Sequence, residues 1–273
     1  MNARAPDRYV VIGNPVAHSK SPRIHALFAA QTRQTIDYTT LLAPLDGFAA
    51  TVRTFIADGG KGANVTVPFK EEAFRLATQL SERAAAAGAV NTLRFDADGA
   101  IYGDNTDGAG LVRDIRHNLG RALAGQRVLL LGAGGAARGT ILPVLQEQPA
   151  QLVIANRTAE KAVALAGEFG TQHTQGCGFA DLAGQHFDIV INATSAGLSD
   201  AALDLPAGVF APGALAYDMV YGRDTPFMQQ ARAAHGRVAD GLGMLVEQAA
   251  ESFLLWRGVR PDTAPVMHAL REA

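Results

Sequence analysis

The most restrictive feature of this chain is the junction at residues 127–147, where an apolar run passes through small residues into a helical pattern. Residues 128–131 read V-L-L-L, and a run without polar alternation is typical of a central parallel strand buried on both faces. Residues 132–137 read G-A-G-G-A-A, and residues 135–147 then have helical periodicity. The junction therefore predicts a parallel sheet with helices on both faces in this part of the chain.

The small residues of this junction fit the pattern G-x-G-x-x-A. Gly132 would permit a tight turn, Gly134 would let a pyrophosphate approach the backbone, and Ala137 would let the helix pack closely on the strand. Free N–H groups and the helix dipole favour an anion at this helix N-terminus. An ordinary glycine-rich turn is the alternative, but the strand before and the helix after favour dinucleotide binding.

The end of the next strand indicates which dinucleotide is bound. Sites for NAD usually place Asp or Glu there to accept a hydrogen bond from the ribose. Residues 154–158 read I-A-N-R-T, with no acid, so that Arg157 could hold a 2′-phosphate with Lys161 as a supporting charge. We therefore predict NADP as the cofactor; the alternative is that Arg157 and Lys161 are solvated residues at a helix start.

Composition excludes several classes of protein. The 273 residues are 48% hydrophobic and only 18% charged, which excludes wholesale disorder. Lys and Arg number 24 against 26 Asp and Glu, with no run of like charge, so we expect neither a nucleic acid nor a membrane surface as partner. The single cysteine, Cys177, excludes an internal disulfide and favours a packed small apolar residue. The seven histidines are scattered, so we expect no metal site.

The N-terminus has no apolar core of the secretory type, and no apolar run reaches about 18 residues. We therefore expect a cytoplasmic protein, acting as a monomer or a homodimer on a small-molecule substrate.

Alternating strand and helix patterns predict an α/β fold of two domains. In the first domain we expect strands at 8–12, 36–42 and 62–67, helices from Ser21 and over 48–56, and a hairpin of 90–95 with 100–103. In the second we expect strands at 127–131, 151–155, 188–192, 215–219 and 237–240, and helices at 135–147 and 158–169. Residues 170–186 are weakly patterned and are assigned no element. Helices at 245–256 and 263–271 end the chain.

The predicted boundaries follow from this pattern. Residues 1–106 with 243–273 form an N-terminal α/β substrate domain to which the C-terminal helices return, and residues 107–242 form a Rossmann-like NADP domain with a parallel sheet. A helix over 106–119 and the start of the late helix near Gly243 would join the two domains. Substrate and nicotinamide would then meet in a cleft that closes to exclude water.

Three segments of the first domain are more polar than turns require. They are residues 13–22, residues 64–70, and residues 91–92 with 103–108. Their hydroxyls, carboxamides, one lysine and one aspartate suit a small polyhydroxylated acid, and two of the segments follow strand ends, where α/β sheets collect ligands.

Six motifs in order extend this pattern across the chain. They are G-N-P-x-x-H-S-K-S-P at 13–22, N-V-T-V-P-F-K at 64–70, N-T-D-G at 105–108, G-A-G-G-A-A-R at 132–138, A-N-R-T at 155–158 and G-x-G-M-L-V-x-Q-A-A at 241–250. Together, from about Tyr9 to Val259, they resemble the shikimate dehydrogenase family. The resemblance implies reversible reduction of 3-dehydroshikimate to shikimate by NADPH, in aromatic amino-acid biosynthesis.

The resemblance also implies roles for single residues. Lys70 and Asp107 would form the catalytic pair, and Ser19 and Ser21, joined by Tyr221, would bind the substrate carboxylate. The residues implied to contact the ring hydroxyls are Asn64, Thr66, Asn91 and Gln248. Those implied to line the NADP site are Ala133, Gly134, Gly135, Ala136, Asn156, Arg157, Thr158, Thr194, Met219 and Gly241. Lys161 stands where some relatives carry arginine, which keeps the charge but loses the fork.

The implied pair suits the chemistry, because reduction of a ketone needs a hydride on carbon and a proton on oxygen. A lysine ammonium can donate that proton, and a neighbouring carboxylate can hold the lysine and share its proton. From the residues alone, Asp107 could instead be an N-cap, Lys70 a surface lysine, Ser21 a helix cap and Gln248 a core amide.

Two alternative functions stay open. One is a shikimate/quinate dehydrogenase with broader use of substrate or cofactor. The other is a non-catalytic NADP-binding regulatory module, although such a binder would not need a proton-transfer pair.

Overall fold

The structure is a computed structural model that describes residues 5–170, 172–196 and 201–272. The chain divides into two compact units, each built on its own six-stranded sheet. The first unit contains the chain up to Gly110 and again from Val246 on, and the second contains Leu111–Leu245. The predicted two-domain α/β fold, with C-terminal helices in the first domain, is confirmed. Within the described ranges, no helix is long and apolar enough to cross a membrane.

The sheet of the first unit is mixed. Its strands are β1 (Asp7–Gly13), β2 (Ile36–Leu42), β3 (Gly60–Val65), β4 (Gln79–Leu80), β5 (Thr92–Phe95) and β6 (Ile101–Asp104), in the order β2-β1-β3-β5-β6-β4. β1, β2 and β3 are parallel, whereas β5 is antiparallel to both β3 and β6. Asn64 of β3, Thr92 of β5 and Asp104 of β6 consequently lie side by side. The carboxyl ends of β3 and β6 and the amino end of β5 thus share one edge of the sheet.

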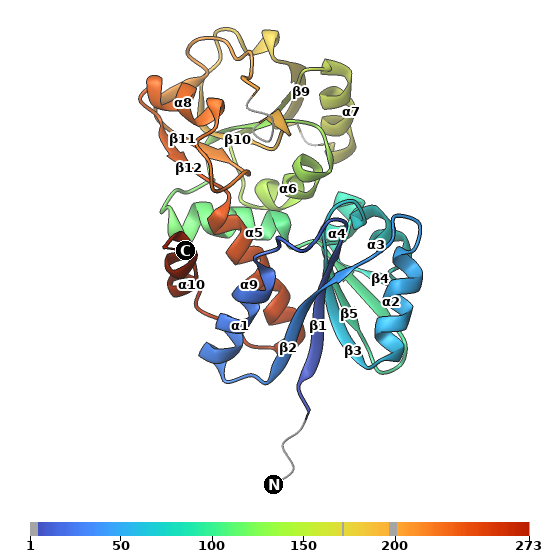
Figure 1. Ribbon diagram of the computed structural model, residues 1–273. Coiled ribbons are helices and arrows are strands. Elements are labelled where there is room, and N and C mark those ends of the chain that lie inside the picture. The colour runs from blue at the N-terminus through green and yellow to red at the C-terminus, as the bar shows by residue number, and fades with distance from the viewer. Residues whose placement is uncertain (1–4, 171, 197–200, 273) are drawn as a thin grey trace. The chain divides into compact units, whose positions relative to one another are not determined.

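Helices cover both faces of this sheet (Figure 1). On β1, Val10 and Ile12 pack in one cluster with α2 (Phe48–Ala57) and α3 (Lys70–Leu76). Tyr9 points to the opposite face, as the two-residue period of a strand requires, and its ring stacks on Trp256 at 4.6 Å between centroids. Trp256 belongs to α9 (Leu242–Arg257), which packs there with α1 (Ser21–Thr32). The remaining helices of the unit are α4 (Glu82–Ala87) and α10 (Ala264–Arg271).

The sheet of the second unit is wholly parallel. Its strands are β7 (Arg127–Leu131), β8 (Gln151–Asn156), β9 (Thr174–Gly178), β10 (Phe187–Asn192), β11 (Phe210–Asp218) and β12 (Arg237–Ala239), in the order β12-β11-β10-β7-β8-β9. The chain runs outward from β7 to one edge and then returns to start again at β10, as in Rossmann folds. Between β7 and β10 lies the topological switch point, where such sheets bind ligands.

The helices of the second unit separate by face. α6 (Gly135–Gln146) and α7 (Ala159–Phe169) pack on one side of the sheet, and α8 (Pro226–Ala233) packs on the other. The strands between them are apolar on both faces, which explains the uninterrupted V-L-L-L of β7.

Several elements differ in detail from the sequence predictions, and β4 was not predicted. The predicted helix over 106–119 is present as Asp107–Asn118, but only α5 (Asp107–Arg113) is α-helical: it continues as a π-helical turn, Asp114–Asn118, which the N–H of Leu119 closes on the carbonyl of Asp114 at 3.0 Å. Residues 170–186, assigned no element, contain β9 and a short 3-10 helix, Ala180–Leu182. α8 was also not predicted; the side chain of Thr225 caps its N-terminus.

Candidate active site

Lys70 and Asp107, far apart in the sequence, meet in the first unit. Lys70 is the first residue of α3 and Asp107 the first residue of α5, and Lys70 Nζ lies 2.5 Å from Asp107 Oδ2. The other carboxylate oxygen of Asp107 accepts a hydrogen bond from Asn91 Nδ2 at 2.8 Å. Both carboxylate oxygens of Asp107 therefore have side-chain partners. The backbone N–H of Asp107 donates to the side-chain oxygen of Asn105. Asp107 is thus not simply an N-cap, and the ammonium of Lys70 has a fixed position.

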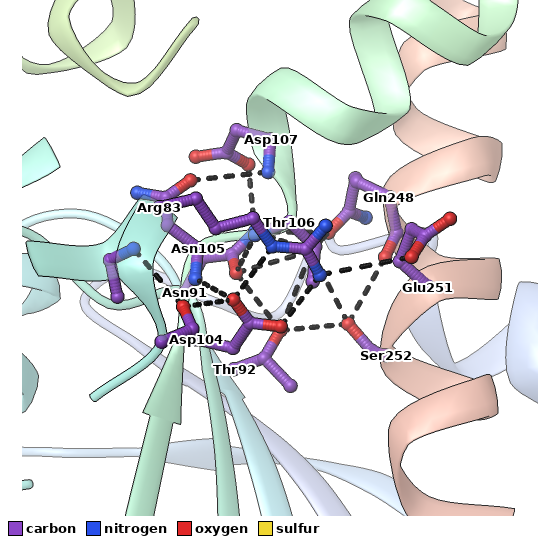
Figure 2. A network of polar contacts seen from close by, with 12 residues as sticks. Arg83, Asn91, Thr92, Asp104, Asn105, Thr106, Asp107, Gln248, Glu251 and Ser252 are labelled. Carbon is purple, nitrogen blue, oxygen red and sulfur yellow. Dashed lines mark hydrogen bonds and ion pairs between the residues drawn. The ribbon is translucent and has the colours of Figure 1, made fainter. Parts of the chain in front are cut away.

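The carboxamide of Asn91 joins this pair to a polar network (Figure 2). Asn91 Nδ2 also lies 2.9 Å from Thr106 Oγ1 and 3.3 Å from Gln248 Oε1. Asn91 Oδ1 accepts from the backbone N–H of Thr106 and from the hydroxyl of Thr92, each at 2.9 Å. Gln248, on α9, is therefore not an isolated core amide but a member of the polar cluster around Asp107.

Asn64, at the end of β3, extends the network away from Lys70. Its side chain bonds to Tyr38 of β2 and to Ser252 of α9. Sequence reasoning singled out neither Tyr38 nor Ser252. For Ser252 a signal exists, because it stands four residues after Gln248 and shares its helix face. For Tyr38 none exists, since a tyrosine in a strand is ordinarily core.

Ser19 and Thr66 lie on loops that follow neighbouring strands, and Ser21 begins the helix after the first of these loops. The N–H of Ser21 bonds to Ser19 Oγ at 3.2 Å, and Ser21 is buried. Ser21 is the first residue of α1 and Lys20 occupies the N-cap, so the alternative that Ser21 is the cap is wrong.

The loop that carries the serines lies directly against the one that carries Thr66. Asn14 N bonds to the carbonyl of Val67 at 3.1 Å, and a Cβ on Gly13 would meet Thr66 Cγ2 at 2.4 Å. A larger residue at position 13 would therefore displace Thr66, which favours the glycine that begins the 13–22 motif.

Ion pairs hold α9 beside the network. The guanidinium of Arg83 binds the buried carboxylate of Asp104 in a bidentate manner, with hydrogen bonds of 2.7 and 2.6 Å (Figure 2). It also lies 3.7 Å from the carboxylate of Glu251 on α9. Burial by itself raises the pKa of Asp104, but the hydrogen bonds and charge of Arg83 outweigh it, so the pKa is lowered overall. Arg260 pairs in turn with Glu251 and Glu247. The helix that carries Gln248 and Ser252 is thereby fixed by charge as well as by packing.

In the second unit, the loop between β7 and α6 has the shape that a pyrophosphate needs. Gly132 has φ +109°, and a Cβ there would lie 3.2 Å from the backbone of Ala193. Around Gly134 and Gly135, no neighbouring heavy atom lies within 4 Å of where a Cβ would stand. No side chain of the described residues caps α6, so its first N–H groups are available to an anion. Ala133 belongs to the same loop, and Ala136 to the first turn of α6.

The residues after β8 fit a 2′-phosphate. Asn156 Nδ2 bonds to the carbonyl of Thr158 at 3.0 Å, which shapes the turn. Arg157 between them is exposed, as is Lys161 one turn into α7. Within the part of the chain that the structure describes, neither cation forms an ion pair. The donors present are therefore those that a phosphate dianion would require.

The other residues implied for the cofactor follow β10, β11 and β12. Thr194 Oγ1 donates to Asn192 Oδ1 at 2.7 Å. A Cβ on Gly241 would meet the carbonyl oxygen of Met219 at 2.1 Å, so these two residues touch and position 241 requires glycine. Tyr221 also belongs to the second unit, where burial raises its pKa. Its contact with the substrate carboxylate stays a prediction.

Three family models match the chain in order. They are the shikimate dehydrogenase substrate binding domain at residues 11–93, the shikimate / quinate 5-dehydrogenase domain at 114–199, and the shikimate 5'-dehydrogenase C-terminal domain at 241–271. A curated relative from Dechloromonas aromatica, shikimate dehydrogenase (NADP(+)), is 65% identical over 268 residues, 97% of each chain.

Solved structures agree with these matches. An Ael1 enzyme from Pseudomonas putida is 52% identical with a TM-score of 0.92, covering 97% of this chain and 98% of its own. Shikimate 5-dehydrogenase from Thermus thermophilus, in complex with NADP(H) and shikimate, is 33% identical with a TM-score of 0.86, covering 97% and 99% of the two chains. With relatives this similar along nearly its whole length, the chain belongs to the shikimate dehydrogenase family.

Proposed function

We propose that this protein is an NADP-dependent shikimate dehydrogenase, which reduces 3-dehydroshikimate to shikimate reversibly. The observation that carries the proposal is the contact of Lys70 Nζ with Asp107 at 2.5 Å, beside a network of carboxamides and hydroxyls. Relatives over 60% identical, named shikimate dehydrogenase (NADP(+)), support the choice of substrate and cofactor.

The protein's part in the reaction is to place and move one proton. NADPH, when bound, supplies the hydride that the carbonyl carbon receives. Lys70 as an ammonium donates a proton to the carbonyl oxygen, and in the reverse direction the neutral amine removes the hydroxyl proton. Asp107 holds the Lys70 side chain, and Asn91 in turn holds Asp107 through a 2.8 Å hydrogen bond.

The binding residues divide between the two units. In the first, Ser19 and Ser21 are proposed to bind the carboxylate, with Asn64, Thr66, Asn91 and Gln248 on the ring hydroxyls. In the second, the uncapped start of α6 suits a pyrophosphate, and Arg157 with Lys161 suits a 2′-phosphate.

Initial rates test the proposal. Shikimate and quinate are each offered with NADP⁺ and with NAD⁺, and reduced nicotinamide is followed by absorbance. We expect the highest kcat/KM for shikimate with NADP⁺, because no acid follows β8 to favour NAD. A preference for quinate or for NAD⁺ would instead support the broader shikimate/quinate enzyme, and tight NADPH binding without any turnover would support a regulatory module.

We further propose that the protein works in the cytoplasm as a monomer or a homodimer. Support for this location comes from its single cysteine, Cys177, since intracellular proteins seldom depend on disulfides. Light scattering coupled to size exclusion, at several concentrations, distinguishes the two oligomeric states by mass.

A further inference from the structure

We propose that Tyr38 and Ser252 are positioning residues that orient the carboxamide of Asn64, so that its oxygen faces a substrate hydroxyl. This inference rests on the proposed function, because it concerns the same substrate site. Asn64 is 6% exposed and lies at the carboxyl end of β3. Tyr38 reaches it from β2 and Ser252 from α9, two elements at opposite ends of the sequence.

The amide nitrogen of Asn64 is fully used within the protein. It has two hydrogens, and three acceptors lie in range: Ser252 Oγ at 2.9 Å, Thr92 Oγ1 at 3.1 Å and the backbone carbonyl of Asn91 at 3.2 Å. No hydrogen of this nitrogen is left over for a ligand.

The carbonyl of Asn91 excludes the flipped amide, and the hydroxyls of Tyr38 and Ser252 hold the orientation that remains. If the group were rotated by half a turn, Asn64 Oδ1 would face this carbonyl oxygen, and neither atom could donate. Asn64 Oδ1 therefore faces Tyr38, whose hydroxyl donates to it at 2.7 Å. A carbonyl oxygen has two lone pairs. The His25 imidazole lies near this oxygen, but neither of its ring nitrogens forms a hydrogen bond among the described residues, so the second lone pair is the capacity left for a ligand. Asn64 can accept from a substrate hydroxyl but cannot donate.

Tyr38 and Ser252 are themselves held in place. The Tyr38 ring stacks on the His25 imidazole, with centroids 4.1 Å apart and planes inclined by 11°. Ser252 is fully buried, and its hydroxyl lies 3.1 Å from the backbone carbonyl of Gln248 and 2.8 Å from Thr92 Oγ1, while its oxygen accepts from Asn64. Because both groups are buried, water cannot readily replace either one.

Two conservative variants test the proposal, Tyr38→Phe and Ser252→Ala. Each removes one hydrogen bond to Asn64, and we expect the KM and the calorimetric Kd for shikimate to rise about three- to tenfold, the worth of one neutral hydrogen bond. We expect kcat to change less, and the Kd for NADP⁺ to stay unchanged. The matched control is Tyr9→Phe, which loses a 3.3 Å bond from Arg257 in the same unit and keeps the stacking on Trp256. Its shikimate KM should equal that of the wild type.

A double-mutant cycle distinguishes an effect that acts through Asn64 from a general effect on the folded structure. In an Asn64→Ala background, Tyr38→Phe and Ser252→Ala should have a much smaller effect on shikimate binding, since the group they orient is gone and only their contacts with Ser21 and Thr92 remain. The proposal is overturned if either variant binds shikimate like the wild type, or if its effect is equally large without Asn64. Calorimetry measures the Kd for shikimate without turnover. If the wild type binds shikimate but has no activity, the proposed function is contradicted, and the effect of the two variants on Kd can still be measured. If one variant fails to fold, by its unfolding midpoint, the other completes the cycle.

Discussion

At the scale of single residues, the chemistry of this protein depends on what surrounds each charge. Lys70 is one-third exposed and would be an ordinary surface lysine without the carboxylate of Asp107 at 2.5 Å. Asp107 in turn is held by Asn91, so the geometry of the pair does not depend on either side chain alone.

Lys70→Ala should lower kcat by about 10²- to 10⁴-fold, the usual worth of a general acid–base group. The Kd for NADPH should be unchanged, because the residues that fit NADP belong to the second unit. Steady-state rates and fluorescence titration with NADPH measure both quantities. Lys61→Ala, at an exposed position on β3, is the matched control and should behave as the wild type. Wild-type kcat in Lys70→Ala would show that the proton comes from elsewhere.

His25 is a buried imidazole whose two ring nitrogens have no hydrogen-bond partner among the described residues. Burial lowers the pKa of His25 to about 3, and the nearby carboxamide of Asn64 opposes this only in part. Below pH 6.5 the unfolded chain binds a proton that the folded chain does not, so acid favours unfolding.

His25→Phe should make stability less dependent on pH. For the wild type, this group should decrease the free energy of unfolding by up to about 1.4 kcal/mol per pH unit between pH 6.5 and about 3, and phenylalanine removes that contribution. Urea unfolding at pH 4.5 to 7.5 measures the slope. His173→Phe, at an exposed histidine, is the control and should keep the wild-type slope. Equal slopes for His25→Phe and the wild type would mean that this imidazole is protonated in the fold.

At the scale of elements, α9 has two polar stripes with different tasks. Gln248 and Ser252, four residues apart, face the network around Asn91 and Asn64. Glu247 and Glu251 form the neighbouring stripe and pair with Arg260, and Glu251 also faces Arg83. One helix thereby supplies polar groups to the site and carries the ion pairs that hold it in place.

Arg83→Met should destabilise the protein by about 3 kcal/mol, because it leaves the buried carboxylate of Asp104 without its cation. The matched control is Arg94→Met: Arg94 forks onto Asp96 in the same way, but both side chains are about one-third exposed. Such a surface pair contributes less than about 1 kcal/mol. Chemical unfolding at pH 7 compares the two variants. Equal losses for both would mean that burial of Asp104 does not set the strength of its ion pair.

The turn after β8 should set the choice of dinucleotide. Arg157→Ala should raise the KM for NADP⁺ about tenfold or more and leave that for NAD⁺ nearly unchanged, because only NADP⁺ carries the 2′-phosphate. Steady-state kinetics with both cofactors measure this ratio. Arg116→Ala, at an exposed arginine of the second unit that pairs with Glu147, is the control for loss of a positive charge. A parallel increase for both cofactors would show that Arg157 does not discriminate between them.

At the scale of the whole molecule, the two units should respond to different ligands. Each ligand stabilises the unit that binds it, by about 2.7 kcal/mol at a hundredfold excess over Kd. Shikimate alone should slow amide hydrogen exchange at residues 64–70 and 91–107, and NADP⁺ alone should slow it at 132–137 and 156–161. Exchange followed by mass spectrometry maps this on the intact protein. Protection of residues 132–137 by shikimate but not by NADP⁺ would contradict the assignment of the units.

The sequence alone determined the α/β class, most strands and helices, and the glycine loop after β7. These are local properties: strand and helix periodicity are set by neighbouring residues, and Gly132 is required by its own positive φ. Sequence patterns did not predict β9, because its residues are chosen by contacts with another element. β9 reads T-Q-G-C-G because Gly176 lies against the backbone of α7, where a Cβ would meet the carbonyl of Ala162 at 2.3 Å.

The tertiary structure alone decided how the polar residues meet. The predicted hairpin of 90–95 with 100–103 is confirmed by the antiparallel pairing of β5 with β6. No pattern in the chain states that β5 also pairs antiparallel with β3, yet this pairing brings Asn91 to the edge where Lys70 and Asp107 lie. The contributions of Tyr38 and Ser252 likewise depend on packing between β2, β3 and α9. Hydrogen bonds act over about 3 Å in space, whatever the separation along the chain, so only the folded arrangement reveals which of many polar side chains act together.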